Sequence, residues 1–329
     1  GTKHRPFAAV YVPGADQAWI MESGTQYPSP RAALEAIVGQ SGMLGVEADD
    51  LPAGLAHALG LDDRPWQSAD RALRRWRDEN TLADLPWYII ASRTTHAAIE
   101  AAFSHARDAL ARGRHATEMD SYAPYLETMR AFATQALPNL RAVRTLTNFH
   151  SGARTIFPSN AAPYPLDHAI NTLKLDVGCW LYDREGWLLG CSDIARTITL
   201  SPDAEALYRR FEKGVRHHLI PAARVGASGA DMHRAGVAAV WNASRDLAGN
   251  PLFVELADPQ REYDRDCGHL LGKNNLAHLR FVHDESQVLR EGMIACCEYQ
   301  WPMRNHAIAY EDTCLVTPSG GLNITSDAQ

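Results

Sequence analysis

The chain has 329 residues, of which 46% are hydrophobic and 22% charged, and its formal net charge is -7 at pH 7. This composition is typical of a globular protein and argues against a disordered or membrane-spanning chain. A mildly acidic sequence without a basic stripe also argues against nucleic acid or an anionic membrane as a partner.

The first part of the chain predicts a small α/β domain. Three apolar runs are typical of strands, at residues 7–12, 18–21 and 43–49. Two segments have the pattern of short helices that stop near a glycine, at residues 30–40 and 51–60. The charged segment 62–80 favours a helix that leads out of this domain. We therefore expect an N-terminal domain over residues 1–85, shortened at its beginning, and a larger domain over residues 86–329.

The larger domain begins with helices and continues with strands. Two segments repeat apolar residues at helical spacing and end at Gly113 and before Pro138, at residues 95–113 and 117–137. From about residue 140 strands and turns predominate, interrupted by a helix pair at residues 203–222 and 229–241. This order of elements predicts an α+β domain.

The six cysteines all lie in the second half of the chain. Their spacing is not that of a disulfide framework or a zinc finger. We expect reduced, mostly buried thiols in a cytoplasmic protein.

The stretch LDVGCWLYDREGWLLGCSD predicts a hairpin that brings two aspartates together. With a loop over residues 183–186, Tyr182 pairs with Trp187, and constant register then sets Asp176 opposite Asp193. Directly opposed side chains share one face, with Cβ atoms about 5 Å apart. Two carboxylates so placed repel each other unless a cation lies between them or one is protonated.

The stretch GMIACCEYQWPMRNHAIAYEDTCLVTPSGG repeats this arrangement with glutamates. A turn over residues 303–306 pairs Pro302 with Ala307, and the same counting sets Glu298 opposite Glu311. Both glutamates lie in apolar, strand-like surroundings, which are unfavourable for an unpaired charge.

Four carboxylates on two hairpins suit hard divalent cations, and bridging carboxylates can hold two metals about 3.5–4 Å apart. His269, between glycines in CGHLLG, offers a neutral imidazole to complete the set. The alternative for each residue alone is a solvated strand face or a structural histidine. The repetition of the pattern on two hairpins favours the metal site.

These residues resemble the pita-bread metallopeptidase family, which includes methionine aminopeptidase, aminopeptidase P, prolidase and creatinase. LDVG and SDIARTITLS resemble two of its ligand strands, and CGHLLG resembles its Gly-His element. GMIACCEY and AYEDTCLVT resemble its two glutamate strands. The resemblance implies a pita-bread catalytic domain behind a small N-terminal domain of creatinase type, and a homodimer.

The resemblance also implies which residues bind two divalent ions, of manganese, iron, cobalt or zinc. The implied ligands are Asp176, Asp193, His269, Glu298 and Glu311. Asp193 and Glu311 correspond to the bridging carboxylates of the family, and His269 to a ligand of one metal only.

Four further residues are candidates for substrate binding and proton transfer. Arg265 stands where the family commonly has a histidine, and its planar guanidinium can receive a substrate carboxylate. A salt bridge to a neighbouring aspartate is an equally good interpretation of this arginine. Tyr164 lies near the position of the family's proton-shuttling histidine, and His168 follows it. His283, in a VHD context, corresponds to a second family histidine after an insertion.

The predicted function is therefore a metal-dependent hydrolase of the Xaa-Pro dipeptidase or aminopeptidase type, acting on a small peptide. Glu298 accepts the proton of the attacking water, and His168 or His283 assists at the oxyanion or the leaving nitrogen. One alternative is a family member that acts on a small molecule, as a creatinase-like C–N hydrolase or a lyase. A metal-free binding module is another, although such proteins typically lose the ligands that this chain retains.

Overall fold

A computed structural model describes most of the chain. The described residues are 6–10, 19–22, 27, 29–40, 42–49, 51–156, 159–166, 172–263, 265–273, 279–302 and 306–325. The chain forms two compact units, Gly1–Trp76 and Arg77–Gln329. The domain boundary that we placed at residue 85 stays a prediction.

The first unit is a small α/β structure, as the sequence predicts. Its strands pair as two ribbons: antiparallel β1 (Pro6–Val10) with β2 (Trp19–Glu22), and parallel β3 (Leu44–Val46) with β4 (Trp66–Ser68). Its helices are α1 (Pro30–Val38), α2 (Ala53–Ala58) and a 3-10 turn at Leu61–Asp63, followed by α3 (Asp70–Asp78). Strand β4 lies in the segment for which the sequence predicts a helix, and this part of the prediction is wrong. The strand forms because it pairs with β3, a contact that local helical spacing does not reveal.

The first half of the larger unit is a sheet covered by two long helices. The helices are α4 (Leu85–Ala111) and α5 (Glu118–Ala136), and α5 begins at a capping box in which Thr117 and Asp120 exchange hydrogen bonds. The strands are β5 (Ala116–Thr117), β6 (Arg141–Ser151), β7 (Pro165–Leu166), β8 (Thr172–Tyr182), β9 (Leu188–Cys191) and β10 (Ile194–Thr199), with a 3-10 turn at Gly152–Ile156. Strand β8 is central, between β6 on one side and β9 and β10 on the other.

The second half repeats this architecture. The helical segments are α6 (Pro202–Gly214), a π-helical turn at Val215–Leu219, α7 (Ile220–Ala222), α8 (Gly229–Asp246) and α9 (Pro259–Glu262). The strands are β11 (Gly268–Leu270), β12 (Ile294–Pro302), β13 (Ala307–Thr317) and β14 (Gly320–Asn323). They form an antiparallel sheet in the order β11-β12-β13-β14.

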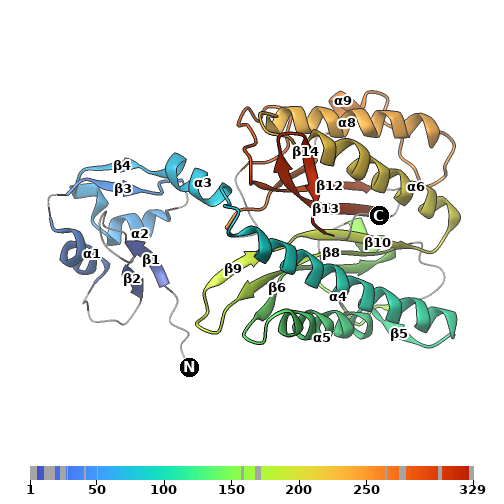
Figure 1. The fold of residues 1–329 in the computed structure, drawn as a ribbon, viewed down its shortest axis with the longest axis horizontal. Helices are drawn as coiled ribbons and strands as arrows, with labels where there is room; N and C mark the ends of the chain where they lie inside the picture. Colours follow the sequence, from blue (N-terminus) through green and yellow to red (C-terminus); the bar gives the residue numbers. More distant parts are fainter. Residues whose placement is uncertain are drawn as a thin grey trace. The chain divides into compact units, whose positions relative to one another are not determined.

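Each sheet buries its apolar face against its own helices (Figure 1). Alternate residues of β8, such as Leu173, Leu175 and Val177, pack against α4 and α5 in one core. In the other core, Tyr299 of β12 and Tyr310 of β13 pack against residues of α6 and α8. Because side chains alternate across a strand, the residues between these core positions point away from the helices.

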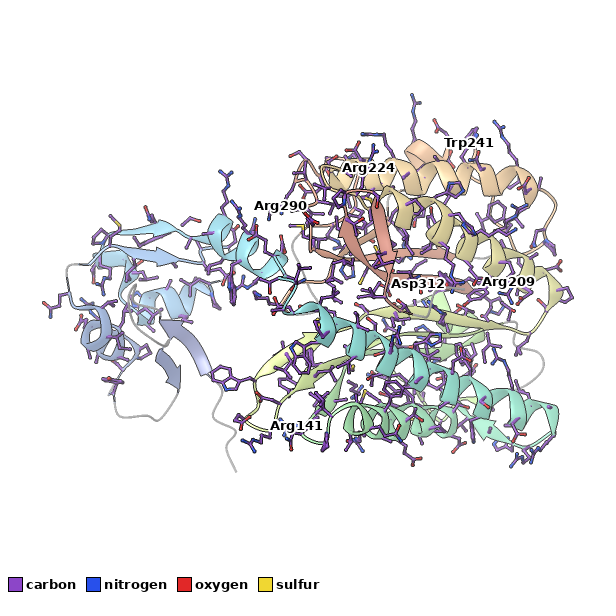
Figure 2. All side chains as sticks on the ribbon, in the orientation of Figure 1. Arg141, Arg209, Arg224, Trp241, Arg290 and Asp312 are labelled. Atoms are coloured by element: carbon purple, nitrogen blue, oxygen red, sulfur yellow. The ribbon has the colours of Figure 1, made fainter. Side chains whose placement is uncertain are left out.

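The two sheets meet where β10 runs beside β13. The Thr197 hydroxyl donates to the Ala309 carbonyl at 3.0 Å and accepts from the Ala309 amide at 3.1 Å. The Arg196 guanidinium donates to the Glu311 carbonyl and to the carboxylate of Asp312, which lies at this junction (Figure 2). Side-chain hydrogen bonds therefore hold together the two sheets that carry the candidate ligands.

Candidate metal centre

Asp176 and Asp193 come from the first sheet. Asp176 lies in β8, on the face opposite to its core residues, and Asp193 lies in the link between β9 and β10. Asp193 is almost fully buried, and Asp176 is 9% exposed. Both carboxylates therefore point away from α4 and α5 and toward the second sheet.

The predicted register of this hairpin is wrong. Asp176 lies opposite Ala195, and Tyr182 pairs with Leu188 instead of Trp187. The reason is a longer loop, closed by a hydrogen bond from the Asp183 amide to the Trp187 carbonyl, and an irregularity in the pairing at Leu181–Tyr182. The net shift is two residues, which leaves Asp193 on the same face as Asp176 because the side-chain period of a strand is two.

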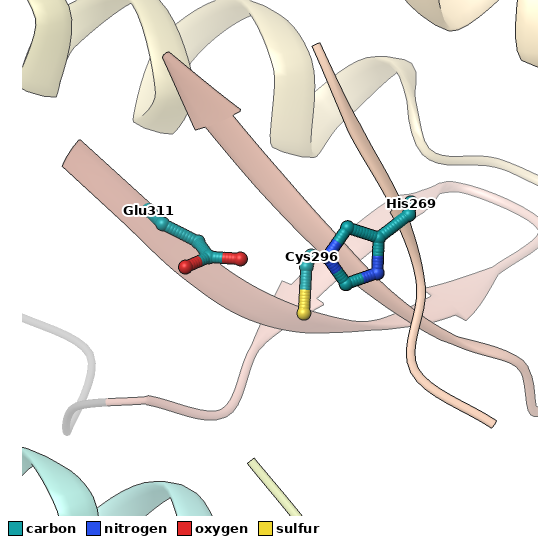
Figure 3. Close-up of side chains that lie close together, drawn as sticks. All are labelled: His269, Cys296 and Glu311. Atoms are coloured by element: carbon teal, nitrogen blue, oxygen red, sulfur yellow. The ribbon is translucent and has the colours of Figure 1, made fainter. Parts of the chain in front are cut away.

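The predicted register of the second hairpin is confirmed. Glu298 pairs with Glu311, and Pro302 pairs with Ala307. Strand β11 adds to β12 so that His269 lies opposite Cys296, two residues before Glu298 and thus on the same face. Figure 3 shows Cys296 between the ring of His269 and the carboxylate of Glu311.

The side chains from the two sheets converge. Asp176, Asp193 and Glu311 each offer a carboxylate oxygen, and these oxygens lie within 4.8 Å of one another. His269, Cys296 and Glu311 form a second such group, and the His269 Nε2 lies 3.9 Å from the Asp193 carboxylate.

Glu298 joins the cluster through an amide. The Gln300 side-chain amide donates to the carboxylate of Asp176 at 2.8 Å and to that of Glu298 at 3.2 Å. The Asn148 amide also donates to Asp176, at 3.3 Å. These two amides orient Asp176 and Glu298 without neutralising their charge.

Burial and mutual repulsion disfavour the charged carboxylates. Burial and the neighbouring charges of Asp176 and Glu298 raise the pKa of Asp193 well above its usual range. Burial, followed by Asp193 and Glu298, does the same to the pKa of Glu311. Burial, followed mainly by Asp176, raises the pKa of Glu298 to about 8. These shifts are what closely spaced carboxylates show when no cation lies among them.

Two buried carboxylate oxygens of the cluster, Asp193 Oδ1 and Glu311 Oε1, have no hydrogen-bond partner among the described residues. Buried polar atoms are normally hydrogen-bonded, so each such oxygen indicates a missing partner. Carboxylate oxygens around a neutral imidazole are the donor set of hard and intermediate divalent ions. The residues present therefore fit a divalent metal.

His269 is held in the form that binds metals. Its Nδ1 lies 2.9 Å from the Leu270 carbonyl and donates to it, which leaves Nε2 as an acceptor facing Asp193. Burial lowers the pKa of His269 and favours the neutral ring. The preceding Gly268 has φ +128°, and a Cβ there would lie 2.0 Å from the Cys296 carbonyl oxygen. Only glycine allows β11 to approach β12 so closely.

Cys296 belongs to the cluster but not to the predicted ligands. Burial raises the pKa of its thiol well above the usual range, and the Glu311 charge adds to this effect. The sulfur lies 3.9 Å from the Thr313 hydroxyl and from the Asp193 carbonyl. A protonated thiol in this position is a packing residue, consistent with the interpretation of the cysteines as buried thiols.

The other predicted residues lie outside both ligand groups, and one of them lies outside the described chain. The exposed Arg265 donates to the Gln300 carbonyl at 3.3 Å, while the neighbouring Asp266 binds Arg280. Tyr164 is 48% exposed and lies under the guanidinium of Arg154. The ring of His283 lies 6.2 Å from that of His233 and outside both ligand groups. His168 lies outside the described residues.

Sequence reasoning missed four polar residues of this region. Asn148 and Gln300 bind the cluster directly, and His150 and Lys174 lie beside it on paired strands. The alternation in TLKLDVG could have revealed Lys174, which shares the face of Asp176 two residues earlier. The other three require knowledge of which strands pair.

The family model of metallopeptidase family M24 matches residues 89–318. The chain belongs to this family. No curated protein sequence matches the chain significantly. Among the described residues, no helix has both the length and the hydrophobicity of a membrane-spanning segment.

Solved structures show the same pita-bread fold at low sequence identity. Prolidase from Pyrococcus furiosus is 16% identical with a TM-score of 0.71, covering 92% of this chain and 81% of that one. Xaa-Pro dipeptidase from Bacillus anthracis is 17% identical with a TM-score of 0.68, covering 90% and 77%. The N-terminal domain of the FACT complex subunit SPT16 from chickpea is 14% identical with a TM-score of 0.68, covering 90% and 72%. The fold is thus shared by peptidases and by a subunit of the FACT complex.

Proposed function

We propose that this M24 family member is a hydrolase that uses two divalent metal ions and cleaves an amide bond, as an Xaa-Pro dipeptidase or aminopeptidase does. The observation that carries the proposal is the convergence of Asp176, Asp193 and Glu311 with two buried oxygens that lack partners. Such a cluster would destabilise a metal-free protein that used this fold only as a scaffold, because buried charges are unfavourable without a cation.

The proposed ligands are the five residues that the family resemblance implies. Asp176, Asp193, His269, Glu298 and Glu311 would hold two ions of manganese, iron, cobalt or zinc. All of these except Glu298 belong to the two groups of close ligand atoms. Bound there, the ions would lower the pKa of a water and polarise the carbonyl that it attacks.

The chain's own residues would then bind the substrate and move the protons. Glu298, which is partly accessible and oriented by Gln300, would accept the proton of the attacking water. His168 and His283 are the proposed donors to the leaving nitrogen. Arg265 and Tyr164, both exposed, would contact the substrate beyond the scissile bond.

Metal analysis and activity assays test this proposal together. The protein is stripped with a chelator, reloaded with manganese, cobalt, zinc or iron, and assayed on Xaa-Pro dipeptides. We expect about two ions per chain and metal-dependent hydrolysis. Asp193→Asn should lose both, because it removes a shared ligand. Glu185→Gln is a matched control, since it neutralises an exposed carboxylate at the tip of the same hairpin.

Two alternatives make different predictions in the same experiment. A metal-loaded protein that hydrolyses or eliminates small guanidino or amide compounds, but no proline peptide, would be a small-molecule member of the family. The arginine at position 265, where the family commonly has a histidine, favours this alternative. A protein that binds no divalent ion would be a binding module, as the similarity to the SPT16 domain allows. The homodimer and the cytoplasmic location stay predictions.

A further inference from the structure

Two buried polar side chains hold the chain where it leaves β11, the strand of His269. Asn80 lies in the segment that connects α3 with α4, and Tyr88 lies in the first turn of α4. Asn80 is 8% exposed and Tyr88 is 2% exposed. Both residues precede residues 89–318, the region that matches the family model, so this match assigns them no role.

Their hydrogen bonds go to two successive backbone carbonyls. The Asn80 Nδ2 donates to the Leu271 carbonyl at 2.9 Å. The Tyr88 hydroxyl lies 2.6 Å from the Gly272 carbonyl and 2.9 Å from the Asn80 Oδ1, and its single proton can go to either acceptor. Strand β11 ends at Leu270, so side chains satisfy the two buried carbonyls that follow it.

These bonds act on the His269 ring through one intervening peptide group. The His269 Nδ1 donates to the Leu270 carbonyl at 2.9 Å, which directs Nε2 toward the Asp193 carboxylate. The Leu270 carbonyl belongs to the peptide group directly before the one that Asn80 holds. Only the two backbone dihedrals of Leu271 separate these two planar groups, so a change in the second group also moves the first.

Tyr88 also packs against segments that supply ligands from both sheets. Its ring and the side chains of Cys191 and Leu271 belong to one buried apolar cluster. Cys191 precedes Asp193 by two residues, and Leu271 follows His269 by two residues. Because buried side chains are closely packed, this one ring helps to set the position of both ligand segments.

We propose that Asn80 and Tyr88 are positioning residues that fix the orientation of the His269 imidazole. This inference rests on the proposed function, in which His269 binds one of the two ions. Partners that orient a metal ligand directly are worth roughly 10–100-fold in metal affinity. Asn80 acts one peptide group away from the ring, so we expect the lower end of this range. The ion that His269 binds should depend on Asn80, and the other ion should not.

A calorimetric titration of chelator-treated protein with manganese tests this dependence. Asn80→Leu keeps the size of the side chain but removes its amide, and we expect it to weaken one of the two ions about tenfold. The affinity of the other ion should change little. The control Asn250→Leu removes an amide that donates to the Asp203 carbonyl at 3.0 Å, in the turn after α8, and should leave both affinities unchanged. Equal weakening of both ions by Asn80→Leu, or no weakening, would overturn the proposal.

A second variant guards against misfolding of the first. Tyr88→Phe removes a single oxygen and keeps the buried ring, so the fold should be preserved. The same ion should be weakened by a smaller factor of about 3–5-fold, because Asn80 still holds the Leu271 carbonyl. Unchanged affinity of this ion in Tyr88→Phe would refute the role of the hydroxyl.

Hydrogen exchange of the metal-free protein separates this inference from the proposed function. The backbone amides of residues 268–272 should exchange about 5–10-fold faster in Asn80→Leu than in the wild type, while those of β13 should not change. If the wild type binds no divalent ion but shows this local effect, the positioning inference stands and the metal proposal fails. If the wild type binds ions and cleaves peptides, but neither variant changes exchange or affinity, the positioning inference is wrong and the proposed function stands.

Discussion

The four-carboxylate cluster makes the stability of the metal-free protein depend on pH through Glu298. Its pKa lies at about 8 in the folded chain, against 4.5 ordinarily. A carboxyl with a raised pKa contributes stability that is fully present below pH 4.5 and lost as the pH rises through about 8. Glu298 therefore makes the metal-free protein less stable as the pH rises from 5 to 8, and Glu298→Gln should gain stability relative to the wild type over this range.

The size of the effect follows from the shift. Each pKa unit corresponds to about 1.4 kcal/mol, so the rise of the Glu298 pKa corresponds to at most about 5 kcal/mol. Water reaches Glu298, which is only partly buried, and reduces this to about 2–3 kcal/mol. Removing its charge also relieves Asp193 and Glu311, whose pKa values it helps to raise. For a unit of this size, the melting midpoint of the wild type should fall by about 4–12 °C relative to that of Glu298→Gln over this pH range.

Scanning calorimetry of chelator-treated protein at pH 5, 6, 7 and 8 measures this difference. Between pH 5 and pH 8, the midpoint of the larger unit should fall in the wild type relative to Glu298→Gln, because Asp193, Glu311 and the buried His150, whose pKa values are also shifted, titrate in both proteins. Saturating manganese should reverse the trend, since metal binding requires deprotonated ligands and strengthens as the pH rises. A difference in midpoint between the two proteins that stays constant from pH 5 to pH 8 would refute the reasoning, because it would mean that the charge of Glu298 is already compensated in the folded chain.

Three other perturbations follow from the same contacts. Arg196→Met should lower the free energy of unfolding by about 3–5 kcal/mol, because it leaves the fully buried Asp312 without its main cation. Urea denaturation of this variant, of Asp312→Leu and of the double variant forms a double-mutant cycle, in which the losses of unfolding free energy should be far from additive. Gly268→Ala should displace His269 and weaken metal binding at least about tenfold in a metal titration. The control Gly186→Ala also changes a glycine with positive φ, but at an open hairpin tip, and it should leave metal binding intact. The six buried thiols should not react with a disulfide reagent until the chain unfolds, and fast labelling of Cys296 in native protein would contradict its protonated, enclosed state.

The two hairpins show what register counting can and cannot predict. Counting outward from the turn gave the correct Glu298–Glu311 pair because β12 and β13 pair without interruption. The same counting failed for Asp176 and Asp193, since the longer loop and the irregular pairing near Tyr182 are not encoded in residue spacing. The predicted face of the sheet was still correct, because a shift of two residues does not change the side on which a side chain projects.

Contacts between distant strands were the main part of the site that the sequence did not reveal. Gln300 reaches Asp176 from the other sheet, and His150 meets Lys174 only because β6 pairs with β8. The extent of α4 was also underestimated: the predicted helix begins at residue 95, whereas α4 begins at Leu85, with Pro86 in its first turn. Proline at this position is favourable, but the pattern alone does not show whether it starts a helix or ends a loop.

The cluster also bears on the difference between an enzyme and a relative of the same fold that lacks the metal-binding residues. In a binding module, replacing Asp193 or Glu311 by a neutral residue would remove a buried, repelling charge and stabilise the protein. Stability alone therefore favours loss of these ligands once no cation is bound. This chain keeps both carboxylates, the imidazole of His269 and the glycine that admits it, at positions where each is unfavourable by itself. A bound cation gives the charged form of the whole set a favourable energy, so this combination of residues favours metal chemistry over a purely structural use of the fold.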